Sequence, residues 1–437
     1  MGILSSLLGN MEIDGDVSAD ITVICPEKKT ILFGKALVNN FIFNQEPIGD
    51  VFAIAGMDTL GKVNFSGGIF QKDFASEKSQ LADFSITSLR NDKDVIVRLN
   101  GEYATDGKSL AIHTRFDSLN AGFLAPFLSG FSDEFVGTAS GQLSFYSNSK
   151  KSYFDGTVRA NDIRMGIAPL GTHYNVKEQD IRFNEEGIFF DNMKITDKDG
   201  NIAYMNGDIK HNLFQNMKIN LGISTDRLLV LNTPRDVTAL FYGDGYVSGD
   251  VSIRGNEDII SFKGPNLKTL NGSHIALQVT SSNSAIQSNV IHFKPKPTTN
   301  GSESESTNKS TESSTLLDFD FTFNVSNETE LELYLESIGG TMNARANGKF
   351  QLTYNDNEDV NLFGNLDIYS GDFKISLFNV INSKFTLVPE GKILFDGPLE
   401  NMLVNVSAYK SSKTSLTDIL PQGSAVGNNV TVNAYLH

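Results

Sequence analysis

The chain has 437 residues, 40% of them hydrophobic, and its 52 acidic and 36 basic side chains give a formal net charge of −16. That charge disfavours a nucleic-acid partner, because Lys and Arg side chains that neutralise phosphates supply most of such affinity, and it also disfavours adhesion to an anionic membrane surface. The length exceeds what one compact core usually holds, so we expect either several domains or one elongated, repetitive body.

The first residues carry no recognisable targeting segment. Residues 1–15, MGILSSLLGNMEIDG, are too short and too soon acidic for a signal peptide or a membrane span. The only cysteine, Cys25, excludes an intramolecular disulfide, and we expect it to be a buried structural thiol. If the protein works in a cell envelope, its membrane anchor is expected in an N-terminal part that this chain lacks.

Alternation of apolar and polar side chains predicts β-strands along almost the whole chain. Clear examples, in chain order, are the segments 94–103, 110–119, 217–225, 316–325 and 365–377. Turn-forming runs such as TDG, DKDGN and PEGK separate the strands, and a spacing of roughly 9 to 14 residues predicts on the order of 30 of them. Each strand therefore has one apolar face and one polar face.

Helices are expected only as short pieces, at 4–8, 123–131 and 416–420. Residues 294–315 contain no aliphatic or aromatic side chain, which predicts a disordered insertion rich in Ser, Thr and Glu. Strand patterning resumes directly after it. We therefore divide the chain into a β segment at 1–293, the insertion at 294–315 and a second β segment at 316–437.

Several architectures would satisfy this alternation. A propeller should show a repeat of roughly 40 to 50 residues, and no such repeat is visible. A membrane barrel needs aromatic girdles, whereas Trp is absent here and the turns are charged. Two all-β architectures remain: an elongated sheet that curls to protect its apolar face, or a string of sandwiches.

No catalytic residue, metal site or cofactor is predicted. The six histidines show no ligand spacing, and no nucleophile elbow or glycine-rich phosphate loop occurs in a strand–turn–helix context. Asp318 and Asp320 alternate with apolar residues, which favours a solvated outer face over acid–base chemistry. Asp197, Asp199 and Asn201 suggest a calcium loop only faintly, and a tight turn explains them without a metal.

Two stretches resemble the C-terminal region of the TamB family, the inner-membrane subunit of the translocation and assembly module. At 364–420 the sequence GNLDIYSGDFKISLFNVINSKFTLVPEGKILFDGPLENMLVNVSAYKSSKTSLTDIL has the family's order of strands, Ser-Gly turn and terminal short helix. At 127–211, FVGTASGQLSF is followed by DIRFNEEGIFFDNMKITDKDGNIAYMNGDIKH, and FYGDGYVSGDVSIRG at 241–255 continues in the style of the Bacteroidetes members. The resemblance covers about residues 81–437, and the chain is expected to be a fragment truncated at both ends.

The resemblance implies a fold similar to a taco: one long sheet bent lengthwise, with an apolar inner face and a polar outer face. It also implies a non-enzymatic envelope protein whose hydrophobic groove carries phospholipid acyl chains between the inner and outer membranes. The alternative role is protein secretion and outer-membrane protein assembly, by pairing of a sheet edge with a TamA/BamA-type barrel. The expected location is the periplasm, with an anchor in the inner membrane in the full-length protein.

The predicted groove lining consists of apolar side chains on alternating strand positions. The residues are Ile181, Phe183, Met217, Ile219, Leu221, Phe319, Phe321, Phe323, Phe373, Ile375, Phe385, Leu387, Ile393, Phe395, Val404 and Val406.

Overall fold

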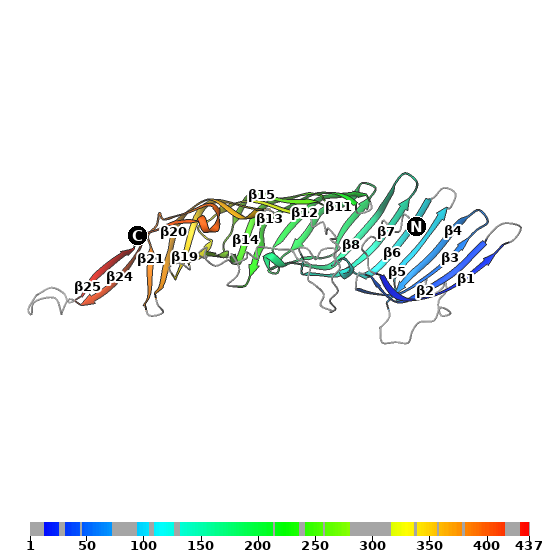
Figure 1. Ribbon diagram of the computed structural model, residues 1–437, viewed down its shortest axis with the longest axis horizontal. Helices are drawn as coiled ribbons and strands as arrows, with labels where there is room; N and C mark the ends of the chain where they lie inside the picture. The colour runs from blue at the N-terminus through cyan, green and yellow to red at the C-terminus, as the bar shows by residue number, and fades with distance from the viewer. Residues whose placement is uncertain are drawn as a thin grey trace, which may run out of the picture.

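The computed structural model shows one elongated, curved sheet in which the strands succeed one another along the long axis (Figure 1). It describes residues 13–25, 31–43, 46–71, 94–104, 109–125, 132–212, 215–235, 241–256, 258–279, 316–335, 339–355, 358–377, 381–415 and 429–436. Within these ranges 25 strands join into a single sheet. The predicted all-β, elongated architecture is thereby confirmed. The insertion at 294–315 and the short helices expected at 4–8 and 416–420 lie outside the described residues.

The first half of the chain supplies strands β1 to β13. Their bounds are β1 Ile13–Ile24, β2 Ile31–Phe43, β3 Glu46–Met57, β4 Lys62–Phe70, β5 Val95–Ala104, β6 Ser109–Asn120, β7 Glu134–Ser147, β8 Ser152–Ile167, β9 Thr172–Val176, β10 Gln179–Asn184, β11 Gly187–Thr196, β12 Ile202–Asn212 and β13 Gln215–Thr233.

The second half supplies strands β14 to β25. Their bounds are β14 Phe241–Gly255, β15 Ile259–Thr269, β16 His274–Val279, β17 Leu316–Val325, β18 Glu330–Leu335, β19 Gly340–Asn355, β20 Glu358–Leu377, β21 Ile381–Leu387, β22 Lys392–Pro398, β23 Leu403–Asn405, β24 Ala408–Ser415 and β25 Asn429–Leu436.

Helical structure in the described ranges consists of three short 3₁₀ turns and one further helical residue, Ala125, directly after the first of them. The turns are η2 Ala121–Leu124, η3 Ala168–Leu170 and η5 Leu399–Asn401. Of the helix expected at 123–131, residues 123–125 are helical, and residues 126–131 lie outside the described residues. None of the described helices has the length and hydropathy needed to cross a bilayer.

Most strands pair antiparallel with their neighbours in sequence, as hairpin connections require. The exception is the join across residues 280–315, where β15 pairs parallel with β17 and β16 pairs parallel with β18. β15 and β16 both pair with β14, so they are two parts of one long strand with a break between them. In the same way, β17 and β18 both pair with β19 and form a second long strand with one break. At the breaks the buried hydroxyls of Thr269 and Thr329 are 2.6 Å apart. The sheet therefore continues without a gap across the join.

A line of irregular positions crosses the sheet, and we call it the crease. It includes four non-glycine residues with positive φ inside strands: Asn40 (52°), Ser118 (56°), Asp162 (49°) and Asn192 (51°). The strand register shifts at each of these positions. Because a bulge bends its strand and increases the local twist, a row of bulges bends the whole sheet lengthwise.

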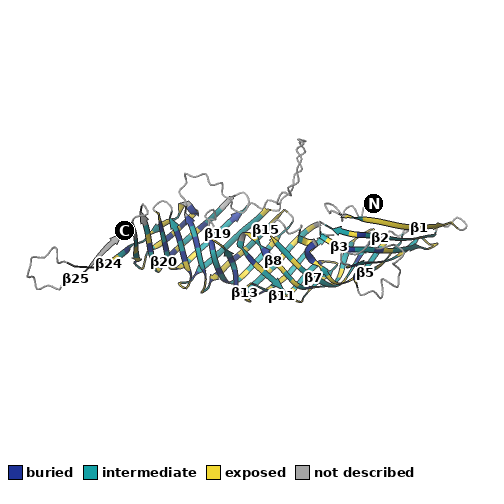
Figure 2. Ribbon diagram, turned by 90° about the horizontal axis from the view of Figure 1, so that it is seen from below, coloured by how far each residue is buried: buried dark blue, intermediate teal, exposed yellow. Residues whose placement is uncertain are grey.

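The interior of the C-terminal strands contains a large cluster of buried hydrophobic residues. Its buried residues, which we call the closed core, are Val325, Leu331, Leu333, Met342, Ala344, Ala346, Leu362, Leu366, Ile368, Phe373, Leu387, Ile393, Phe395, Leu399 and Ala408, none more than 8% exposed. Figure 2 shows this concentration of buried positions around β19 and β20.

A smaller cluster lies near the N-terminal end. It contains Leu37, Phe52, Phe70 and Val95, and the first three side chains are fully buried. Leu37 pairs with Phe52 and lies on the face opposite to Val38 and Val51. In β2 and β3 both faces are therefore apolar, and simple alternation does not hold there.

Cys25 is exposed, which corrects the expectation of a buried thiol. It directly follows β1, and among the described strands β1 pairs only with β2. Apolar residues of the same strand, such as Val17 and Ile21, are also exposed, at 70% and 64%. Among the described residues, little covers β1 or the cysteine that follows it.

Candidate functional site

The candidate site is the apolar face of the sheet. Direct cross-strand partners share a face, so the register identifies which residues form continuous rows. From β7 to β17 a first row contains Gly141, Val158, Ile181, Phe190, Gly207, Leu221, Ile253, Phe262 and Phe319. Each member is the direct partner of the next, and all are half-buried.

A second row runs beside the first. It contains Leu143, Gly156, Phe183, Ile188, Ile209, Ile219, Gly255, Ile260 and Leu317, again half-buried throughout. We call the two rows together the open strip. No member has a charged, amide or hydroxyl side chain, so the strip is an unbroken apolar surface across these strands.

The opposite face of the same strands is polar. Arg159 on β8 and Asp180 on β10 are register partners, and the guanidinium donates to both carboxylate oxygens, at 2.7 and 3.1 Å. The hydrogen bond from Arg159 lowers the pKa of Asp180. Arg182 and Asp191 form a similar pair at 2.8 Å. This face is solvated, as the alternation predicted.

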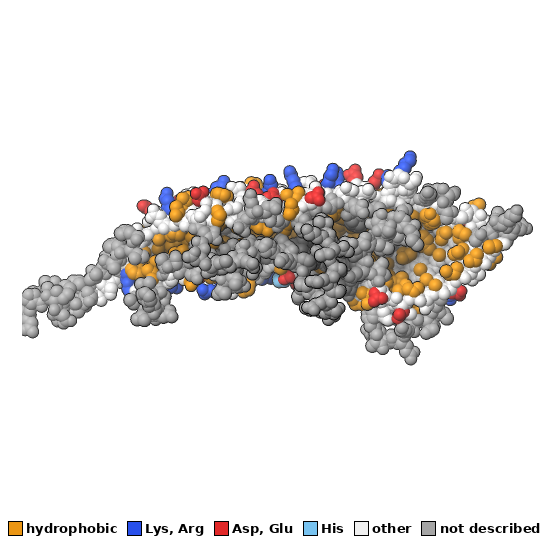
Figure 3. Space-filling view, viewed as in Figure 1, with side chains coloured by type: hydrophobic (Ala, Val, Ile, Leu, Met, Phe, Trp, Pro, Cys, Tyr) orange, Lys and Arg blue, Asp and Glu red, His pale blue; other side chains and the backbone are white. Residues whose placement is uncertain are grey.

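Figure 3 shows the same division on the surface. Hydrophobic side chains line a hollow at the end of the molecule that holds the N-terminal strands, and Lys, Arg, Asp and Glu side chains project along the outer edge. The large apolar residues of β1 are exposed toward solvent, with Val23 at 56%. The apolar face is therefore accessible over part of its length.

The structure divides the predicted lining residues into two groups. Ile181, Phe183, Ile219, Leu221 and Phe319 belong to the open strip, and Met217, Phe321 and Phe323 lie on the same face of their strands. Phe373, Leu387, Ile393 and Phe395 belong to the closed core, while Ile375, Phe385, Val404 and Val406 are half-buried and pack against it. Both groups of residues lie on the same sheet, but the first is on the half-buried open strip and the second is in or against the closed core.

Several strip residues were absent from the predicted set, among them Phe190, Ile253 and Phe262. The sequence contained a signal for Phe190. In GIFFDNMKIT the apolar residues fall first on even-numbered positions, Ile188 and Phe190, and then on odd-numbered positions, Met193 and Ile195. The register shift between Phe190 and Met193 is the structural counterpart of that change.

A run of aromatic rings connects the open strip to the closed core. Neighbouring ring centroids are 5.0 Å apart for Phe262 and Phe319, 6.0 Å for Phe319 and Phe321, and 6.2 Å for Phe321 and Phe323. The run continues from Phe323 to Phe350 at 5.2 Å, and from Phe350 to Phe395 at 5.9 Å. We call these six residues the aromatic run. Its first rings are half-buried and its last ring belongs to the closed core.

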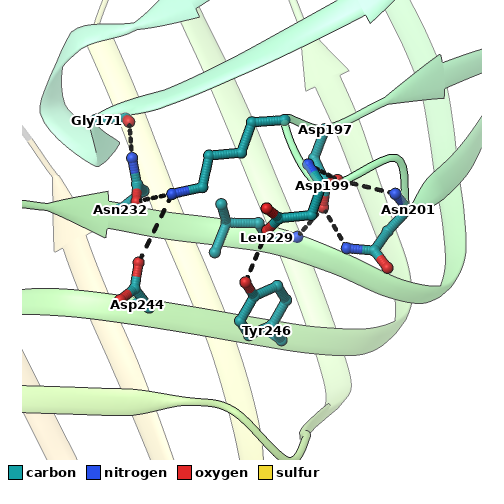
Figure 4. A network of polar contacts seen from close by, with 9 residues as sticks. Gly171, Asp197, Asp199, Asn201, Leu229, Asn232, Asp244 and Tyr246 are labelled. Atoms are coloured by element: carbon teal, nitrogen blue, oxygen red, sulfur yellow. Dashed lines mark hydrogen bonds and ion pairs between the residues drawn. The ribbon is translucent and has the colours of Figure 1, made fainter.

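The turn between β11 and β12 is fixed by the buried carboxylate of Asp197 (Figure 4). Its Oδ1 accepts hydrogen bonds from the backbone N–H groups of Asp199 and Asn201, at 3.0 and 2.9 Å. Its Oδ2 accepts from Asn201 Nδ2 and from the backbone N–H of Leu229 on β13, both at 2.8 Å. Both oxygens are thus occupied by donors, which supports the tight turn. Among the described residues no group of three or more His, Cys, Asp or Glu is placed to hold a metal ion.

Further contacts tie this turn to its neighbours. Tyr246 donates its hydroxyl to Asp199 at 2.7 Å, and that bond, together with burial, raises the pKa of Tyr246 to about 12. Tyr174 on β9 donates to the carbonyl of Leu229 at 3.0 Å, and burial raises the pKa of Tyr174 to about 12. Lys198 contacts Asn232 and Asp244. These contacts join β9, β11, β13 and β14 at one rim of the sheet.

Comparison with known proteins gives one match. A family model described as the TamB C-terminal domain matches residues 191–437. This range contains the resembling stretch at 364–420 and begins inside the stretch at 127–211. No curated protein and no solved structure matches the chain.

Proposed function

The chain belongs to the TamB family of cell-envelope proteins of the translocation and assembly module, and we propose that its apolar face carries phospholipid acyl chains between the inner and outer membranes. The role is non-enzymatic: the protein supplies a surface, and no bond is made or broken. We place it in the periplasm, with an inner-membrane anchor in the full-length protein. The β segments before and after residues 294–315 act together as one groove.

The open strip is the observation that carries this proposal. It offers half-buried aliphatic and aromatic side chains, with four glycines and no polar side chain among them, over nine strands between β7 and β17. Each methylene group removed from water contributes about 0.8 kcal/mol. An acyl chain that leaves a bilayer therefore needs contact with apolar surface along its whole length, while its charged headgroup stays in water.

The chemistry of the strip favours an acyl chain over an extended polypeptide. A polypeptide lying on this face would bury its own N–H and C=O groups, and each needs a hydrogen-bond partner. The strip side chains have no donors or acceptors, and the backbone groups between neighbouring strands are used in the sheet ladder. A hydrocarbon chain has no such requirement.

A second candidate function is assistance in outer-membrane protein assembly, and the sheet edges favour it. Among the described strands β1 pairs only with β2, and β25 pairs only with β24. In this role a strand of the partner would pair with one of these strands through main-chain hydrogen bonds. Under this proposal a TamA/BamA-type barrel would be the partner.

Substitution within the strip tests the lipid proposal. Leu221→Asp places a carboxylate in the first row, and Asn220→Asp places the same group on the exposed outer face of the same strand. We expect both proteins to fold, because a half-buried carboxylate can still reach water, and only Leu221→Asp to lose about tenfold in co-purified phospholipid and in transfer between vesicles. Wild-type lipid content in a folded Leu221→Asp protein would instead favour the assembly role.

A further inference from the structure

The apolar face has two different environments along its length. Strip residues such as Leu221 and Ile253 are half-buried, so part of each side chain contacts solvent. At equivalent inward positions of the C-terminal strands, Leu333, Met342 and Phe373 are direct cross-strand partners with exposures of only 1%, 1% and 6%. The two rows of the strip are therefore accessible, whereas these inward positions of the C-terminal strands are filled. Buried inward residues also occur elsewhere on the strip strands, such as Met193 and Val247, at 4% exposure each.

A second row of the C-terminal strands agrees. Val325, Gly348, Leu366, Ile393 and Val404 follow one another in register from β17 to β23. Val325, Leu366 and Ile393 are buried, at 6%, 1% and 0% exposure, and Gly348 and Val404 are half-buried. Protein interiors are packed as densely as organic crystals, so a filled core has no space for an additional hydrocarbon chain.

The aromatic run lies at the transition between these environments. Phe319 is both a member of the strip and the second ring of the run, and Phe395 is both its last ring and a member of the closed core. Phe323 has Leu267 on one side and Phe350 on the other as direct cross-strand partners, and Leu267 is 4% exposed. Along the run itself, exposure falls at the last ring: Phe350 on β19 is half-buried, and Phe395 on β22 is 5% exposed.

Resting on the proposed lipid role, we infer that acyl chains bind on the open strip only, and that the aromatic run is the end of the lipid-binding surface. The strands from β18 to β24 hold no lipid, because their own side chains occupy the interior. To enter there, an acyl chain would have to separate side chains that are in contact, and forcing extra methylene groups into a filled core is destabilising. A chain that moves along the strip leaves it at the aromatic run.

Photo-crosslinking of the unmodified protein tests this division. The protein is incubated with vesicles of phosphatidylethanolamine and phosphatidylglycerol that contain a phosphatidylcholine with a diazirine in the middle of one acyl chain. After irradiation, the modified residues are mapped by peptide mass spectrometry. We expect adducts on the strands of the strip, including β10, β13 and β14, to exceed those on β19, β20 and β22 by more than about tenfold.

The outcomes distinguish this inference from the function on which it rests. Adducts that extend with similar yield to Met342, Leu366 and Ile393 would overturn the inference while supporting the lipid role. Adducts nowhere on the apolar face would overturn both. The same lipid with the diazirine in its headgroup is the control, and we expect it to modify polar residues outside the two rows of the strip.

Discussion

The carboxylate of Asp197 accepts a hydrogen bond from the backbone N–H of Leu229 at 2.8 Å, and both residues are buried, at 3% and 1% exposure. This bond joins the turn after β11 to β13, two strands further along the sheet. A buried backbone N–H without a partner is costly, and Asp197 supplies the partner here. The contact therefore links the position of a loop to the packing of the sheet at the rim of the groove.

We predict that Asp197→Ala lowers the free energy of unfolding by about 2 to 3 kcal/mol, because buried donors lose their acceptor. Asp199→Ala is the matched control: its carboxylate is exposed and accepts from Tyr246, so the loss should be about 1 kcal/mol or less. Urea unfolding followed by circular dichroism measures both. Equal losses in the two variants would show that the bond to Leu229 does not hold the rim.

Stability should fall between pH 10 and pH 12 because of Tyr174. Its pKa is raised from 10 to about 12 by burial, so the folded state binds the phenolic proton more tightly than the unfolded state. The resulting stabilisation is fully present below pH 10 and is lost as the pH rises toward 12, by up to about 3 kcal/mol. In Tyr174→Phe the decline between these pH values should be shallower. An unchanged slope of urea midpoint against pH in this variant would contradict the assignment.

Leu221 and Leu366 form a matched pair for the two parts of the apolar face. Leu366→Ala should cost about 2 to 5 kcal/mol, because it leaves a cavity in the closed core, and should leave lipid binding unchanged. Leu221→Ala should cost about 1 kcal/mol, because the side chain is only half-buried, and should weaken lipid binding. Urea unfolding and lipid co-purification are measured on both proteins. The reverse assignment of the two effects would place the lipid in the C-terminal strands.

Strand positions and the apolar face followed from the sequence because alternation is a local property. In β5 and β13, for example, Val97 and Leu221 lie on the expected face. The difference between the open strip and the closed core could not be predicted in this way. Phe321 and Phe395 occupy equivalent alternating patterns, yet one is half-buried and the other is 5% exposed. The exposure of an inward side chain depends on which residues lie across the bent sheet from it. The bend itself comes from the crease, whose single irregular residues interrupt the alternation of apolar and polar side chains.

The last prediction concerns the crease. Asn192 has a φ of 51°, and its backbone N–H donates a hydrogen bond to Asn206 Oδ1 at 2.6 Å. Because of this extra residue Phe190 and Met193, three positions apart, both face the apolar side, as their partners Gly207 and Met205 show. In a regular strand residues three apart lie on opposite faces.

Asn192→Val should therefore lower the free energy of unfolding by about 1 to 2 kcal/mol, because a β-branched residue is strained at positive φ. Asn192→Gly should stay within about 0.5 kcal/mol of the wild type, since glycine adopts this conformation readily and keeps the N–H donor. Lys194→Val, on an exposed position of the same strand without positive φ, controls for the side chain itself. If Asn192→Val is as stable as Lys194→Val, the bulge does not depend on the conformation of residue 192. If instead Asn192→Val alone is destabilised and also loses bound lipid, the bend of the sheet and the apolar surface depend on the same residue.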